Sequence, residues 1–329
     1  MKLNASLVED FKAAWWIKNP HTQTLYAPLL RHIHPPISKT ERLELPDGDF
    51  IDLSWADANL PPDAPLIICL HGLGGNIRSP YVAGFFTAFN RMGWRAVLMH
   101  FRGTSQEPNR LARAYHSGET EDFDYVMHTL CQREPHTPKA AVGVSLGGNV
   151  LLKWLGEHPD QTLLRAATAV SVPYQLAIVS NRINQGFSRI YQAHLLKRLR
   201  KVFHKKMQHY PDQLPFTMEE LNAIESFWVF DNQITAPLHG FADANSYYTQ
   251  SSALQYLPFI TTPTCLIHAL DDPFMTFDAV PTTTQLSAST TLCLSERGGH
   301  VGFIAGSVPG KPIYWLEQKI PEYLKTWLT

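Results

Sequence analysis

AAVGVSLGGNVLLKW, residues 140–154, places one serine between two glycines, after an apolar run and before a helical pattern. Its GVSLG segment at 143–147 matches the pattern G-x-S-x-G. A strand that turns sharply into a helix strains the residue at the apex, and small neighbours let the chain pass without a clash. The apical hydroxyl then stands above the strand ends, beside a helix N-terminus that favours negative charge. The stretch therefore predicts that Ser145 is a nucleophile; a capping serine in a glycine-rich turn is the alternative.

Segments on either side of this turn alternate between strand and helix patterns. Continuous apolar runs are typical of strands buried on both faces of a parallel sheet, and they occur at residues 65–70, 94–101, 139–144, 163–172, 262–270 and 290–297. ERLEL and FIDLSW, at residues 41–45 and 50–55, alternate in polarity, which predicts strands with one exposed face. Helical periods fill residues 79–93 and 146–155. This alternation predicts an α/β fold with a mostly parallel central sheet flanked by helices.

The alternation stops between residues 174 and 250, which look mainly helical, and two strand patterns follow. We therefore expect a helical cap, residues 174–250, inserted before the last two strands. The α/β core then comprises residues 41–173 and 251–329, and residues 1–40 form an N-terminal segment that packs on the body. Helical pieces separated by Pro321 are expected to close the chain.

Composition narrows the classes of partner and cofactor. Charged residues make up 17% of the 329 residues, and the formal net charge is −1. Nucleic acid is not an expected partner, because phosphate binding needs an excess of Lys and Arg. The four cysteines form no C-x-x-C and no H-E-x-x-H occurs, so neither a metal nor another cofactor is expected. Glu9 and Asp10 stand where a signal peptide needs apolar residues, and a cytoplasmic location is expected.

A serine nucleophile needs a base, and the base needs a carboxylate that fixes its tautomer and stabilises its cation. At a turn of this type the acid and then the histidine follow the serine along the chain. Asp271 and Asp272 come directly after one strand pattern, and His300 lies in a glycine-rich loop after the next. Asp272, directly before Pro273, is the preferred acid, with Asp271 as a neighbouring turn residue. His300 is the expected base, because no other histidine lies beyond residue 270.

Acyl transfer also requires two N–H donors for the negative charge that develops on the carbonyl oxygen. One expected donor is the backbone N–H of Leu146, directly after the serine. The other is expected from HGLGG, residues 71–75, where the N–H of Leu73 follows the His-Gly turn. This loop matches neither G-x-G-x-x-G nor the G-K-[ST] of a P-loop, so a nucleotide site is disfavoured.

Six segments in chain order resemble the YheT-type α/β-hydrolases, which are related to the mammalian abhydrolase-domain lipid hydrolases: HGLGGN, HFRGTSQEPNR, YHSGETEDF, GVSLGGNVLLKW, ALDDPF and GGHVGF. The leading WWIKNPHTQTL, residues 15–25, also resembles that group, so the resemblance spans nearly the whole chain. It implies an α/β-hydrolase fold with a Ser-His-Asp triad at Ser145, Asp272 and His300. It also implies esterase- or lipase-like activity on carboxylic esters, and it narrows the reaction type more than the substrate.

The leading hypothesis is therefore a serine hydrolase that cleaves a carboxylic ester or lipid of short or medium acyl length, without a cofactor. A thioesterase or an amidase would use the same triad, because leaving-group preference depends on the shape of the pocket. A non-catalytic lipid-binding protein on the same fold is the other alternative. It gives no reason for the serine, the acid and the histidine to occur together.

The stretch that leads into the cap and fills its first half is strongly basic. Between Asp160 and Asp212 the chain carries no acidic residue and nine basic ones: Arg165, Arg182, Arg189, Lys197, Arg198, Arg200, Lys201, Lys205 and Lys206. An apolar stripe accompanies them: Leu195, Leu196, Leu199, Val202 and Phe203. Such a helix can lie on anionic lipid and aid access to amphiphilic substrates, but packing of the stripe on the core is the favoured interpretation. Binding to anionic vesicles that is unchanged when these basic residues are replaced would contradict the membrane hypothesis.

Overall fold

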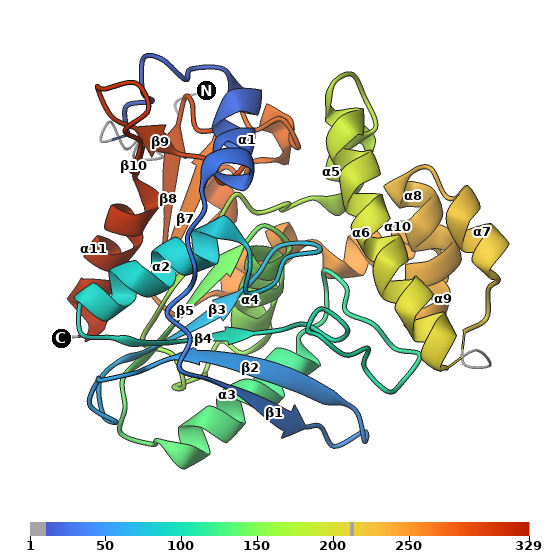
Figure 1. The fold of residues 1–329 in the computed structure, drawn as a ribbon, viewed down its shortest axis with the longest axis horizontal. Helices are drawn as coiled ribbons and strands as arrows, with labels where there is room; N and C mark the ends of the chain where they lie inside the picture. Colours follow the sequence, from blue (N-terminus) through green and yellow to red (C-terminus); the bar gives the residue numbers. More distant parts are fainter. Residues whose placement is uncertain (1–10, 211–213, 329) are drawn as a thin grey trace.

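The computed structural model describes residues 11–210 and 214–328, with an eight-stranded sheet at their centre (Figure 1). The strand order is β1-β2-β4-β3-β5-β6-β7-β8. The strands are β1 (Lys39–Glu44), β2 (Phe50–Ala56), β3 (Leu66–Leu70), β4 (Arg95–Met99), β5 (Lys139–Val144), β6 (Ala166–Val170), β7 (Thr264–Ala269) and β8 (Thr290–Ser295). β2 runs antiparallel to both β1 and β4, and the remaining neighbours are parallel. The predicted α/β class with a mostly parallel sheet is confirmed.

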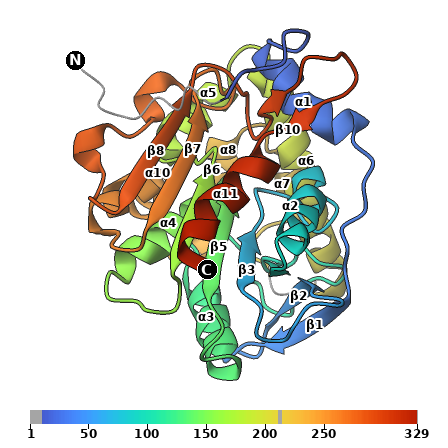
Figure 2. The same ribbon diagram turned by 90° about the vertical axis from the view of Figure 1, so that its left-hand side faces the viewer.

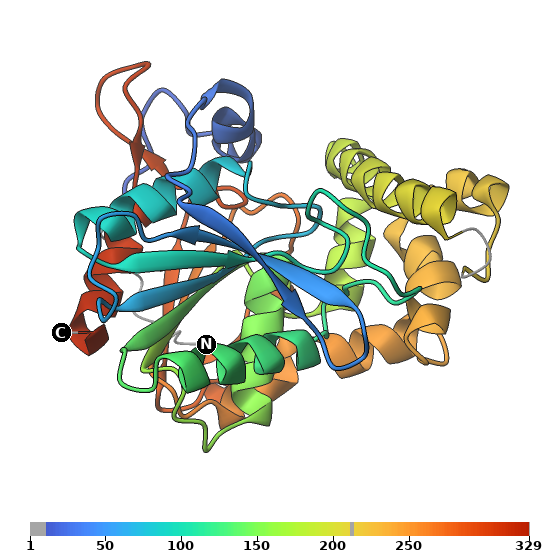
Figure 3. The ribbon, with the colours of Figure 1, turned by 60° about the horizontal axis from the view of Figure 1, so that its bottom comes forward.

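Helices cover both faces of this sheet, because its central strands are apolar on both sides. These helices are α2 (Pro80–Arg91), α3 (Glu121–Arg133), α4 (Leu146–Glu157) and α11 (Leu316–Leu328). On one face α2 and α11 pack against Ile67 and Cys69 of β3. On the other, α3 and α4 pack against Leu66 and Ile68. Figure 3 shows the sheet lying between α2 and α3.

The expectation that residues 50–55 form a strand with one exposed face is wrong, because every residue of β2 is buried. The Oδ1 of Asp52 is 2.9 Å from Nε of Arg42. Ser54 Oγ is 2.9 Å from Nε2 of His100. Because each of these buried polar side chains has a hydrogen-bonding partner on another strand or loop, the alternation in polarity did not report exposure to solvent.

A helical insertion lies between β6 and β7, as the sequence predicted. It comprises α5 (Leu176–Ile183), α6 (Ser188–His209), α7 (Met218–Ala223), α8 (Phe227–Phe230), the π-helical turn η1 (Asp231–Thr235), α9 (Ala236–Leu238), α10 (Ala244–Ser251) and the 3₁₀ segment η2 (Ala253–Phe259). Figures 1 and 3 show the helices α5 to α10 gathered at one side of the sheet. The apolar stripe of α6 faces inward, with Leu196, Leu199 and Phe203 buried in the same core as α4. The exact limits drawn for the domains stay predictions.

The basic residues of α6 divide between solvent and interior. Arg189, Lys197, Lys201 and Lys205 are exposed, whereas Lys206 is fully buried. Contact of the exposed basic side with anionic lipid stays a prediction. Across residues 11–210 and 214–328, no helix is both long enough and apolar enough to cross a bilayer.

The N-terminal segment contains α1 (Pro20–Leu30), which lies beside a small sheet formed by β9 (Ile304–Ala305) and β10 (Ile313–Tyr314) (Figures 1 and 2). The N–H of Ala14 donates to the carbonyl oxygen of Ile304 at 2.9 Å. The small sheet was not predicted, because strands of two residues carry no periodic signal. Two short 3₁₀ turns connect β7 to β8, η3 (Phe277–Ala279) and η4 (Thr283–Gln285).

The expectation of two helical pieces separated by Pro321 is also wrong, because α11 is one helix with Pro321 inside it. Leu316, Ile320 and Leu324 recur every four residues and are buried against the sheet. Full burial of each such side chain contributes about 1.5–3 kcal/mol. The packing of this stripe therefore outweighs the cost of about 3 kcal/mol for a proline in a helix interior.

Candidate active site

Ser145 stands in a strained turn between β5 and α4. Its φ of 53° and ψ of −119° form a backbone conformation that residues with a side chain rarely adopt. Its N–H donates to the carbonyl oxygen of Val170 in β6 at 2.8 Å. A Cβ on Gly143 would lie 2.5 Å from the carbonyl oxygen of Gly147, and one on Gly147 would lie 2.5 Å from that of Leu70. Both glycines are therefore required for β5, α4 and β3 to approach this closely.

Three predicted side chains meet at this turn. The Nε2 of His300 lies 3.1 Å from Ser145 Oγ, and its Nδ1 lies 2.8 Å from Asp272 Oδ2. Asp272 is 3% exposed, and the N–H of Phe274 donates to its other oxygen at 2.8 Å. Burial alone would raise the pKa of Asp272, but the adjacent His300 holds it below its ordinary value. The ionised carboxylate favours a ring proton on Nδ1, which leaves Nε2 free to accept the serine proton.

The neighbouring Asp271 binds the backbone of the loop that carries His300. Its Oδ1 accepts the N–H of Gly299 at 2.8 Å. Burial raises the pKa of this carboxyl group. Of the two aspartates between which the sequence left a choice, the structure brings Asp272 to the imidazole and Asp271 to the backbone of the loop.

The loop after β3 lies directly against the serine. A Cβ on Gly72 would be 3.2 Å from Ser145 Cβ. The N–H of Gly72 donates to the hydroxyl of Tyr81 at 3.0 Å, and the N–H of Gly74 donates to the hydroxyl of Tyr115 at 2.9 Å. The two amides that flank Leu73 are thus occupied by tyrosine side chains.

The two predicted oxyanion donors, by contrast, are available. Within the described residues, neither the N–H of Leu73 nor the N–H of Leu146 has a hydrogen-bond partner. Leu146 is the first residue of α4, where backbone N–H groups have no partner inside the helix. Both N–H groups therefore belong to segments that border Ser145.

His71 fixes the shape of the same loop. Its Nδ1 donates to the carbonyl oxygen of Gly72 at 2.8 Å, while its Nε2 accepts the N–H of Phe101 at 3.3 Å. Burial lowers the pKa of His71 to about 3, so the ring is neutral and acts as a fixed hydrogen-bonding group. The sequence placed His71 in this loop but did not indicate its role, and it gave no sign of Tyr81. Sequence reasoning also missed Tyr115, although this tyrosine begins the quoted motif YHSGETEDF.

Helix α6 of the cap borders the site on two sides. The ring of Phe274 stacks on the imidazole of His300, with centroids 4.0 Å apart and planes 13° from parallel. Tyr191 of α6 packs against Phe274 at a centroid distance of 4.9 Å. Two turns further along α6, Arg198 donates to the carbonyl oxygen of Gly74 at 3.1 Å. Thus α6 packs against Phe274, which stacks on His300, and also binds the loop of residues 71–75 after β3.

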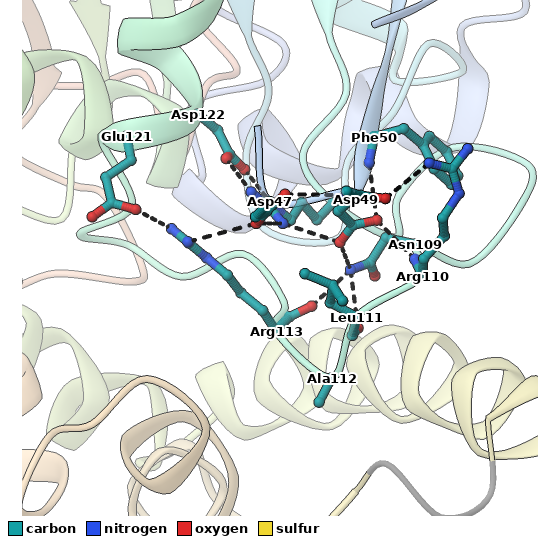
Figure 4. Close-up of polar contacts among 12 residues, drawn as sticks. Asp47, Asp49, Phe50, Asn109, Arg110, Leu111, Ala112, Arg113, Glu121 and Asp122 are labelled. Atoms are coloured by element: carbon teal, nitrogen blue, oxygen red, sulfur yellow. Dashed lines mark hydrogen bonds and ion pairs between the residues drawn. The ribbon is translucent and has the colours of Figure 1, made fainter. Parts of the chain in front are cut away.

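Buried charges hold the loop between β4 and α3 and the first turn of α3, which together contain the quoted segments HFRGTSQEPNR and YHSGETEDF. Asp49 accepts a hydrogen bond from Asn109 Nδ2 at 2.6 Å and another from the N–H of Arg110 at 2.7 Å (Figure 4). Arg102 donates to both oxygens of Asp122, at 2.7 and 2.6 Å. These motif residues thus form a hydrogen-bonded platform beside the cap, and among the described residues they make no hydrogen bond to the triad.

The cap is fastened to this platform by Lys206. Its Nζ donates to the carbonyl oxygens of Leu111, Ala112 and Arg113 at 2.7, 3.0 and 2.7 Å. Burial lowers the pKa of Lys206 to about 7, although the carboxylate of Asp49 opposes this shift. Three carbonyl oxygens surround Nζ: the ammonium form can donate to all three, whereas the neutral amine that prevails above pH 7 can donate to two.

One cluster away from the triad has the composition of a metal site. Potential ligand atoms of His116, Glu119 and His239 all lie within 4.8 Å of one another. However, Arg113 donates to Glu119 at 2.6 Å, and the N–H of Gly118 donates to Nδ1 of His116 at 3.1 Å. Burial holds the pKa of His116 well below its ordinary value, so the neutral ring carries its proton on Nε2. A paired carboxylate and a protonated ring nitrogen do not fit a metal ion.

The chain is similar to known proteins in both sequence and fold. Residues 65–307 match the family model of the alpha/beta hydrolase fold. The Escherichia coli (strain K12) protein named "Putative esterase YheT" is 44% identical, over 94% of this chain and 91% of its own length. Mouse phospholipase ABHD3 is 29% identical, over 94% of this chain and 76% of its own length. The structure of the Pyrococcus furiosus esterase Pf2001 superposes with a TM-score of 0.56 at 14% identity, covering 91% of this chain and 99% of that one, which shows a shared fold alone.

Proposed function

The chain belongs to the α/β-hydrolase fold family, and on this premise we propose that it is a serine hydrolase that cleaves carboxylic esters through an acyl-enzyme on Ser145. One observation carries the proposal. His300 bridges the other two side chains, with Nε2 3.1 Å from Ser145 Oγ and Nδ1 2.8 Å from Asp272 Oδ2. The names of the relatives, an esterase and a phospholipase, support an ester as the substrate.

In the acylation half of the reaction, His300 Nε2 accepts the proton of Ser145 as Oγ bonds to the ester carbonyl carbon. Asp272 stabilises the imidazolium that results. The carbonyl oxygen becomes negatively charged, and the N–H groups of Leu73 and Leu146 donate to it. Loss of one such donor typically costs about 3–4 kcal/mol of transition-state stabilisation. The C–O bond to the alcohol then breaks, and the alcohol leaves with the proton held by His300.

Deacylation repeats these roles with water as the nucleophile. His300 Nε2 accepts a proton from water, whose oxygen bonds to the acyl carbon, and the same two N–H groups donate to the second oxyanion. The bond to Ser145 Oγ breaks, Oγ regains its proton from His300, and the carboxylic acid departs. One ester and one water are consumed, and one alcohol and one carboxylic acid are released, so His300 and Ser145 return to their starting protonation states.

Labelling by a fluorophosphonate probe, together with hydrolysis of p-nitrophenyl esters, tests the proposal. We expect Ser145→Ala to abolish both, while Ser38→Ala, which lies outside the site, retains both. Thermal melting of the two variants establishes that each is folded. Labelling that persists at another residue in folded Ser145→Ala would refute the assignment.

Substrates with matched acyl groups distinguish the ester hydrolase from its alternatives. We expect kcat/KM to be highest for an ester of short or medium acyl length, compared with the thioester and the amide of the same acid. A faster reaction with the thioester or the amide would favour a thioesterase or an amidase. A folded protein that binds lipid but reacts with no acyl probe would favour a non-catalytic lipid-binding protein.

A further inference from the structure

We propose that Thr24 and Gln23 of the N-terminal segment are positioning residues that hold the imidazole of His300 in place. The inference rests on the proposed function, because it assigns His300 the role of the base. From the sequence, the segment was expected to pack on the hydrolase body. In the structure the segment also binds the backbone of the loop that carries His300.

Thr24 binds His300 directly. The N–H of His300 donates to Thr24 Oγ1 at 2.9 Å, and Thr24 Oγ1 donates its own hydrogen to the carbonyl oxygen of Pro20 at 2.7 Å. A hydroxyl group has a single hydrogen, so the contact with Pro20 fixes its orientation and turns a lone pair toward His300. Thr24 is therefore a fixed acceptor for the backbone of the base.

Gln23 fastens the chain four residues beyond the base. This side chain is 0% exposed. Its Oε1 accepts the N–H of Ile304 at 2.7 Å, and its Nε2 donates to the carbonyl oxygens of Ile304 and Ile17 at 3.0 and 2.8 Å. Every donor and acceptor group of the amide thus has a partner, as a buried amide requires. The amide joins the turn before α1 to the end of the histidine loop.

The histidine loop has a conformation that needs external support. Val301 and Phe303 have φ angles of 61° and 44°, in the left-handed region that side chains disfavour. Strained residues of this kind persist only where the surrounding structure over-determines their conformation. Asp271 and Ser171 contribute from the sheet side, through the N–H groups of Gly299 and Val301. Thr24 supplies the partner of the N–H of His300 itself.

Two glycines of the loop bring the N-terminal segment into direct contact with it. A Cβ on Gly299 would lie 2.5 Å from the carbonyl oxygen of Pro20, and one on Gly302 would lie 2.4 Å from that of Gln23. The backbone of α1 therefore lies flat against the loop. Two segments that are far apart in sequence therefore pack directly against each other: PHTQT at residues 20–24 and GGHVG at 298–302.

Thr24 and Gln23 do not contact Ser145 or Asp272, so they act through the position of His300. A misplacement of about 1 Å at a reacting group can lower the rate about 100-fold. The position of His300 Nε2 relative to Ser145 Oγ is therefore the property that these two residues control.

Substitutions at Thr24 test the inference. Thr24→Val removes the acceptor with little change in shape, and Thr24→Ala removes it without adding apolar bulk. We expect both to lower kcat for a p-nitrophenyl ester about tenfold to 100-fold, with KM changed less than about threefold. Thr24→Ser restores the acceptor and is expected to stay within about threefold of wild type. Thr22→Val makes the same change on the exposed side of α1, where Oγ1 contacts Asn19, and is expected to match wild type.

A second readout separates this inference from the proposed function. The Nδ1 proton of His300, hydrogen-bonded to Asp272, gives a low-field NMR signal that does not depend on turnover. We expect this signal to broaden or vanish in folded Thr24→Val and to persist in Thr24→Ser and Thr22→Val. That pattern in a protein without esterase activity would leave the positioning role standing while the proposed function fails. An unchanged signal and an unchanged kcat in Thr24→Val and Thr24→Ala would overturn the positioning role alone.

Discussion

At the scale of single residues, the chemistry depends on which side chain of an adjacent pair turns toward the imidazole. Asp272 lies 2.8 Å from Nδ1 of His300, whereas Asp271 accepts the N–H of Gly299. Both are carboxyl groups within the same turn after β7, yet their environments differ. The pKa of Asp272 is held low by His300 although burial opposes it, and burial raises the pKa of Asp271. Only a base paired with an ionised partner gains stability as it becomes charged during acyl transfer.

Asparagine substitutions at the two positions are predicted to differ sharply in effect. Asp272→Asn removes the negative charge and permits the wrong ring tautomer, so kcat/KM for a p-nitrophenyl ester should fall about 10⁴-fold, as is typical of such a change. Asp271→Asn keeps an oxygen for the N–H of Gly299 and should stay within about tenfold of wild type. Steady-state kinetics of the two purified variants make the comparison. Equal losses, or a larger loss for Asp271→Asn, would contradict the assignment of the acid.

Prediction from the sequence succeeds at this scale where a residue has a fixed place relative to a strand end. Ser145, Asp272 and His300 follow strand patterns in the order that the chemistry requires, and the structure brings them together. Tyr81 and Thr24 could not be found in this way. They bind backbone N–H groups of loops that are distant in sequence, and nothing in the local pattern distinguishes them from other polar residues on a helix.

At the scale of elements, α6 shows how one helix serves both the cap and the site. Its inner face presents Tyr191 to Phe274, Arg198 to Gly74 and Lys206 to the platform loop. The sequence predicted an amphipathic basic helix but not that one of its cations is buried. Carbonyl oxygens of three consecutive residues, 111–113, make that burial tolerable, and this arrangement exists only after the loop has folded.

The pH dependence of stability tests the burial of Lys206. Folding lowers its pKa to about 7, from an ordinary value of 10.5. Between these values the unfolded chain binds a proton that the folded chain has released, so stability rises with pH and is lost as pH falls toward 7. We predict that the free energy of unfolding of wild type rises relative to Lys206→Met across this range, by up to about 1.4 kcal/mol per pH unit. Urea denaturation at a series of pH values measures it, and parallel curves for the two proteins would contradict it.

Where element prediction failed, tertiary contacts decided the outcome. The polar residues of β2 suggested an exposed face, but Asp52 is paired with Arg42 and the strand is buried. Pro321 suggested a break, but the apolar stripe of α11 holds the helix together across it. In both cases the sequence pattern correctly identified the type of residue. Whether the strand is exposed or the helix breaks depended on contacts with residues from other segments.

At the scale of the whole molecule, the fold gathers at one edge of the sheet segments that are widely separated along the chain. The turn of Ser145 follows β5, the loop of Leu73 follows β3, and Asp272 and His300 follow β7 and β8. The carboxyl ends of parallel strands form a common edge, where ligands of open α/β sheets bind. The alternation of strands and helices predicted this architecture and the insertion between β6 and β7. No sequence pattern predicted which residues of the N-terminal segment and of the cap contact the site.

The most direct test of the central claim is the identity of the atom that carries the acyl group during turnover. Wild-type protein mixed with a slowly hydrolysed ester, quenched in acid and digested, is examined by peptide mass spectrometry. We predict an added acyl mass on the peptide that contains Ser145, located on that serine by fragmentation, and no such mass in Ser145→Ala. An acyl group found on a different residue of a fully active preparation would contradict this account.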